Sequence, residues 1–122
     1  MENTKIKAKV SYNGHNANSA GIINLNLIFS YEELTNAIQL IPLLTNNIQI
    51  FTKDGKETNK LGIFTIKNIS INNNGEAKVK FSSLLDSVNL DYINNIIDKD
   101  IIKALFVCDE ISETENDENL PF

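Results

Sequence analysis

The 122-residue chain contains no arginine and no tryptophan, and it has one histidine and one cysteine. Without arginine, no guanidinium group can hold a phosphate or a guanine through two parallel hydrogen bonds. Cys108 has no second cysteine for an internal disulfide, and with His15 it supplies too few ligands for a metal site. Any anion site must therefore use lysine, backbone amides or helix N-termini.

Catalytic patterns are lacking as well. The five glycines are scattered, so the chain has no glycine-rich phosphate loop. The adjacent acids Glu32 and Glu33 fit the first turn of a helix better than a catalytic pair. We therefore expect no catalytic residue, no metal and no cofactor, and we predict that the protein is not an enzyme.

Long apolar runs are missing too. No stretch of 18 apolar residues is present, and the opening MENTKIKAKV lacks the apolar centre of a signal peptide. With a single cysteine, these features predict a cytoplasmic protein without a membrane partner.

Charge divides the chain into a body and a tail. Residues 1–108 hold 11 lysines and 10 acids, whereas six acids and no base follow Cys108. The body has enough apolar residues for a core, at 42% of the whole chain. We predict a compact domain over 1–109 and a disordered acidic tail over 110–122 that ends in an interaction tip. The 18 isoleucines, 19 asparagines and 11 lysines first of all indicate an AT-rich genome.

Alternation of apolar and polar residues predicts six strands in the body. They cover residues 5–12, 21–29, 46–53, 61–71, 77–81 and 100–110, the last apolar on both faces and so central. Turns are expected at Asn13-Gly14 and Asn74-Gly75, and a polar loop from Asp54 through Lys60.

Two helices are predicted between the strands. Ser30 followed by Glu33 forms a capping-box pattern, and the helix it opens should end at Pro42. A second helix is expected over 89–98 with Asn89 as its N-cap.

These elements predict an α+β fold, a single antiparallel β-rich domain with the order ββαβββαβ. The two ββαβ halves share a Phe-Ser pair (Phe29-Ser30 and Phe81-Ser82), which suggests an internal duplication. The alternative is an OB-like β-barrel, which normally has three strands before its helix and would need either a strand hidden in residues 13–20 or a split first strand.

Lysines line the predicted strands in rows. If the first and fifth strands are neighbours, their lysines share one surface, and Phe51 with Lys53 extends it. Cations that follow phosphates and a ring that stacks on a base are what single-stranded nucleic acid requires. The predicted nucleic-acid-binding residues are Lys5, Lys7, Lys9, Phe51, Lys53, Lys78 and Lys80. The same residues also fit purely structural roles: lysine on outer strand faces discourages edge pairing, and Phe51 can belong to a second core layer.

The tail closes with DENLPF, an apolar tip on an acidic segment. Pro121 restricts the backbone beside Phe122, which lowers the entropy lost on docking. A partner with an apolar pocket rimmed by basic residues can hold the ring and attract the acids.

This ending resembles the acidic C-terminal tip of bacterial single-stranded DNA-binding proteins, the SSB family. The resemblance implies that Phe122 anchors in a partner's pocket, that Pro121 is its rigid support, and that Asp117 and Glu118 make electrostatic contacts; Leu120 belongs to the same partner-binding tip. In that family the tip recruits replication, recombination and repair proteins. Asn119 stands where the family usually has an acid, and the body lacks the family's tryptophans, arginines and linker. A divergent member from a phage or mobile element, acting in a bacterial cell, fits this pattern.

We therefore expect a single-stranded DNA-binding protein whose tail recruits replication and recombination proteins, with homo-oligomerisation left open. The alternative is an adaptor or inhibitor that binds no DNA and uses the tip to capture a host protein. A weaker third interpretation is an assembly protein with an incidental tail.

Overall fold

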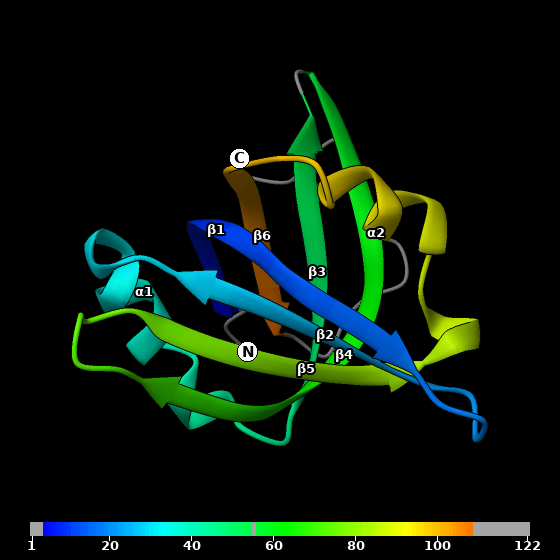
Figure 1. The fold of residues 1–122 in the computed structure, drawn as a ribbon, viewed down its shortest axis with the longest axis horizontal. Helices are drawn as coiled ribbons and strands as arrows, with labels where there is room; N and C mark the ends of the chain where they lie inside the picture. The colour runs from blue at the N-terminus through cyan, green and yellow to red at the C-terminus, as the bar shows by residue number, and fades with distance from the viewer. Residues whose placement is uncertain (1–3, 55, 109–122) are drawn as a thin grey trace.

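The computed structural model describes residues 4–54 and 56–108, which form one antiparallel sheet of six strands with two short helices (Figure 1). The predicted antiparallel, β-rich single domain is confirmed. In chain order the elements are β1 (Thr4–Ala17), β2 (Ile22–Phe29), α1 (Leu34–Ile38), β3 (Asn47–Asp54), β4 (Glu57–Ile71), β5 (Ala77–Leu84), α2 (Leu90–Ile96) and β6 (Ile102–Cys108). Single 3-10 turns cover Tyr31–Glu33, Ile41–Leu43 and Leu85–Ser87.

The strands close into a ring in the order β1-β2-β5-β4-β3-β6, and β6 pairs back with β1. All six ladders are antiparallel. The long strand β1 serves two neighbours, because Thr4–Val10 pairs with β6 and Val10–Ala17 pairs with β2. The last strand, β6, therefore lies between β1 and β3.

The core fills the inside of this ring. Alternate residues of β2 are buried, as the sequence predicts, and the other strands send inward residues to the same cluster. Phe81 and Phe106 stack with ring centroids 5.7 Å apart, and Phe29 lies 5.6 Å from Phe106. Both helices add buried side chains, Ala37 from α1 and Ile93 and Ile96 from α2.

Two connections differ from the prediction. Strand β1 continues through the expected turn at Asn13-Gly14, because a register shift between Tyr12 and His15 absorbs the irregularity. Gly14 adopts a φ of 105° there, which a glycine tolerates. The loop expected through Lys60 is also too long, since β4 already begins at Glu57. The predicted turn at Asn74-Gly75 is present between β4 and β5.

The first helix is shorter than predicted and lacks its cap. The Ser30 side chain makes no capping hydrogen bond, and the Glu33 carboxylate accepts a hydrogen bond from Asn36 Nδ2 at 2.7 Å. The prediction of a capping box at Ser30 and Glu33 is therefore wrong. Asn89 does cap α2, since its Oδ1 accepts from the backbone N–H groups of Asp91 and Tyr92.

The OB-like alternative needed a third strand before the first helix or a split first strand. Two strands precede α1, and the first of them, β1, is continuous but divides its pairing between β6 and β2. Within the described part of the chain, none of the helices is long and apolar enough to cross a bilayer.

Candidate nucleic-acid interface

Strands β1, β6 and β3 present a shared outer face. Their inward residues belong to the core, so the residues between them point outward. In the ladder register Lys9 of β1 lies opposite Lys103 of β6, and Lys103 lies opposite Lys53 of β3. Directly opposed residues on one face are close neighbours. Three lysines from three strands therefore form one row.

The next row places apolar residues between lysines, and the third row has a lysine at one end only. Lys7 lies opposite Leu105, Leu105 lies opposite Phe51, and Lys60 of β4 lies beside Phe51. In the third row Lys5 lies opposite Val107. We call this surface the lysine face, and its six lysines are Lys5, Lys7, Lys9, Lys53, Lys60 and Lys103.

One end of the lysine face is hollowed into an open groove of about 360 Å³. Strands β1, β3 and β6 supply four lysines, and the segment around α1 supplies Glu33 and Asn36. We call this the lysine groove; the lysines that line it are Lys7, Lys9, Lys53 and Lys103. Among the described residues that line the groove, Glu33 is the one acid. Four ammonium groups around one hollow create a positive potential that suits an anionic ligand.

Phe51 does not offer an exposed stacking surface. Its side chain is 3% exposed, and it forms a small buried cluster with Leu105 and Val107, separate from the main core. Lys60 Nζ lies 6.0 Å from the centre of the ring. A place in a second core layer therefore describes Phe51 better than the expectation of a base-stacking ring.

The lysines of β5 lie elsewhere. Strand β2 separates β5 from β1, so the condition under which the lysines of these two strands would share one surface is not met. Lys78 lies opposite Ile28, which lies opposite Ser11, beyond the lysine-bearing half of β1. Lys80 lies opposite Asn26. The structure thus brings together Lys5, Lys7, Lys9, Phe51 and Lys53 but leaves Lys78 and Lys80 outside this surface.

Three residues of this surface are not indicated by the sequence patterns. Lys103 lies in a strand that reads as apolar on both faces, although it interrupts that pattern. Glu33 and Asn36 fall in a predicted helix, and nothing in the sequence indicates that this segment lies against β1 and lines a groove with lysines of β1, β3 and β6.

The other described side chains with reactive groups are the histidine and the cysteine. Tyr12 Oη and His15 Nδ1 are hydrogen bonded at 2.5 Å on β1, which continues past the predicted strand 5–12 to include His15. Cys108 is partly buried at the end of β6. Among the described residues, no three His, Cys, Asp or Glu side chains are grouped as a metal site.

The predicted partner-binding residues lie outside the described residues. They are Asp117, Glu118, Leu120, Pro121 and Phe122.

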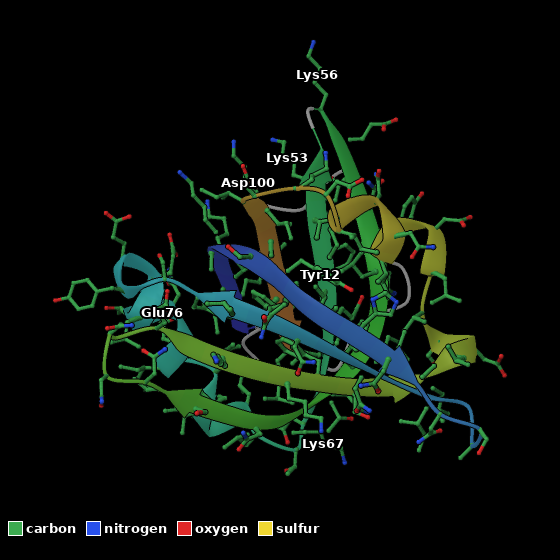
Figure 2. All side chains as sticks on the ribbon, viewed as in Figure 1. Tyr12, Lys53, Lys56, Lys67, Glu76 and Asp100 are labelled. Atoms are coloured by element: carbon green, nitrogen blue, oxygen red, sulfur yellow. The ribbon has the colours of Figure 1, made fainter. Side chains whose placement is uncertain are left out.

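Figure 2 shows how the described basic residues are distributed around the ring. Lys53 lies on β3 on the upper side of the view, and Lys56 projects from the tip between β3 and β4. Lys67 lies at the opposite, lower side. The lysine groove is therefore one local concentration of positive charge on a surface with lysines elsewhere.

The chain was compared with known proteins. No model of a protein family matches it, and no curated protein sequence matches it significantly.

Proposed function

We propose that the protein binds single-stranded DNA through the lysine groove and carries out no catalysis. The observation that carries this proposal is the convergence of Lys7, Lys9, Lys53 and Lys103 from three strands on one open hollow. The successive phosphates of a flexible single strand can contact the lysines of such a row, and each phosphate that is neutralised releases counterions. Lys5 and Lys60 extend the same face along the strands.

The structure separates lysines that the sequence grouped, and this gives a matched test. Lys7→Glu reverses a charge in the groove, whereas Lys80→Glu makes the same change on β5. Fluorescence anisotropy of a labelled oligo-dT across a salt series measures both. Lys7→Glu should weaken binding about tenfold or more and flatten the salt dependence, since single strands lose a log–log slope of about 0.7 per phosphate contact.

Lys80→Glu should change the affinity much less. Equal losses for both variants would show that binding follows overall charge and not the groove. Unchanged binding by Lys7→Glu would remove the groove from the proposal.

We further propose that residues 117–122 recruit replication or recombination proteins, since this segment resembles the SSB tip in sequence. The proposed anchor is Phe122, supported by Leu120 and Pro121, with Asp117 and Glu118 as charged contacts. The tail, with five acids in residues 110–122, is also a competitor of DNA for the lysine groove.

One observation favours the second candidate function, an adaptor or inhibitor that binds no DNA. The burial of Phe51 removes the aromatic ring that was expected to stack on a base. Absence of oligo-dT binding at low salt, with partner capture retained, would establish this alternative.

We also infer that the domain arose by duplication of a ββαβ unit. Exchanging β1 with β4, β2 with β5 and β3 with β6 leaves every neighbour relation of the ring unchanged. The β1–β2 and β4–β5 ladders, which this exchange relates, each contain one register shift. A chain carrying residues 4–54 twice in tandem should then fold into a β-rich domain by circular dichroism; a tandem chain that stays unfolded counts against the duplication.

A further inference from the structure

The lysine groove contains one carboxylate that phosphate binding does not explain. Glu33 lines the groove together with four lysines, and Asn36 stands beside it. Asn36 Nδ2 donates a hydrogen bond to Glu33 Oε1 at 2.7 Å, and both side chains are half-buried. The carboxylate is therefore held in place within the groove.

A carboxylate in this position opposes the binding of phosphates. A carboxylate is an anion with hydrogen-bond acceptors only, about four lone-pair sites in all. The hydrogen bond from Asn36 uses one of these sites. The remaining acceptors suit a ligand group that donates hydrogen bonds, and phosphodiesters have no such group.

The bases of DNA supply that group. Cytosine, adenine and guanine each have an exocyclic amino group with two N–H donors, whereas thymine has no amino group and presents only the single N3–H donor of its imide. Carboxylates accept hydrogen bonds from the N4 amino group of cytosine. In a single strand this edge of the base is not occupied by a pairing partner, so a side chain can reach it.

We propose that Glu33, oriented by Asn36, binds the exocyclic amino group of one base while the lysines of the groove hold the phosphates beside it. The protein then prefers bases that have an amino group over thymine. This inference rests on the proposed function, because it specifies what the same groove recognises.

The test compares labelled oligo-dC and oligo-dT of equal length, about 12 nucleotides, on the full-length protein at pH 7.5. Both oligomers are pyrimidines with the same phosphate backbone, so the comparison isolates the functional groups of the base. Oligo-dC should bind about tenfold tighter, the size of one good contact to a base edge.

The deciding variant is Glu33→Met, with Glu32→Met as its matched control. Both remove one carboxylate from the same 3-10 turn, but Glu32 is exposed and does not line the groove. Glu33→Met should bring the dC to dT affinity ratio close to one and tighten binding of oligo-dT. Glu32→Met should keep the wild-type ratio. A purely structural role for Glu33 would leave the ratio unchanged.

Each outcome has a distinct meaning. Equal binding of both oligomers by the wild-type protein, or a preference that survives Glu33→Met, overturns this inference and leaves the proposed function standing. Binding of neither oligomer overturns both. If Glu33→Met does not fold, the side-chain amide signal of Asn36 in the wild-type protein decides, since it should shift with cytidine monophosphate and not with thymidine monophosphate. Equal shifts overturn the inference.

Discussion

Gly62 is the residue whose replacement the fold resists most directly. It lies on β4 at a φ of 145°, opposite Ile50, and forms an isolated bridge with Val88. A Cβ placed there would lie 2.5 Å from the carbonyl oxygen of Ser87 and 2.8 Å from the Cα of Val88. Both contacts are with backbone, which cannot move aside as a flexible side chain can.

Gly62→Ala should therefore lower the free energy of unfolding by about 3 kcal/mol, the upper range for a strained backbone position. Gly21→Ala is the control, because Gly21 also has a positive φ, of 81°, but a Cβ there meets nothing within 4 Å. Urea denaturation followed by circular dichroism measures both. Equal losses would mean that backbone conformation alone, and not the approach of residues 87–88, requires glycine at position 62.

A second prediction at the residue scale separates the two roles considered for Phe51. Because Phe51 is buried with Leu105 and Val107, Phe51→Ala should cost about 3 kcal/mol of stability by leaving a cavity. Lys53→Ala, two residues along the same strand, should leave stability nearly unchanged and weaken binding of oligo-dT. Thermal unfolding and fluorescence anisotropy are measured on both variants. A Phe51→Ala protein of wild-type stability that binds DNA weakly would restore the base-stacking role.

At the scale of single elements, the two helical segments differ in how their N-terminal ends are capped. Asn89 caps α2 through hydrogen bonds to two backbone N–H groups, whereas Ser30 makes no such bond at the turn before α1. Asn89→Ala should lower the free energy of unfolding by about 1 kcal/mol, the usual value of an N-cap, and Ser30→Ala by much less. Chemical denaturation of the two variants checks this. A larger loss for Ser30→Ala would mean that the capping box forms in solution.

Local sequence patterns predicted the individual strands and helices better than they predicted the lysine face, which several strands build together. The alternation in Ile22–Phe29 and the cap at Asn89 act within a few residues, so the sequence was sufficient for both. The row Lys9–Lys103–Lys53 depends on which strands are neighbours, and that depends on ring closure by residues nearly one hundred positions apart. The sequence alone could not exclude that β5 lies beside β1. In the structure β2 pairs with both strands and so separates them.

At the scale of the whole molecule, we predict that the tail does not contribute to the stability of the folded ring. If residues 117–122 act as a recruiting segment, deletion of Phe122 should leave the melting temperature of the protein unchanged. The same deletion should abolish capture of replication or recombination proteins from a bacterial extract, with the wild-type chain as the reference. A melting temperature lowered by several degrees would instead make Phe122 part of the folded domain, and the recruitment proposal would fail.

The position of β6 in the ring also has a consequence for how the chain folds. Until the last strand is in place, β1 and β3 remain open edges, and such edges invite pairing with other chains. Closing the ring joins Thr4 to Cys108, a contact of very long sequence separation, which slows folding. The nascent protein should therefore pass through an open, aggregation-prone intermediate for most of its synthesis. Ring closure completes both the fold and the lysine groove, so the DNA-binding surface that we propose forms in the final step of folding.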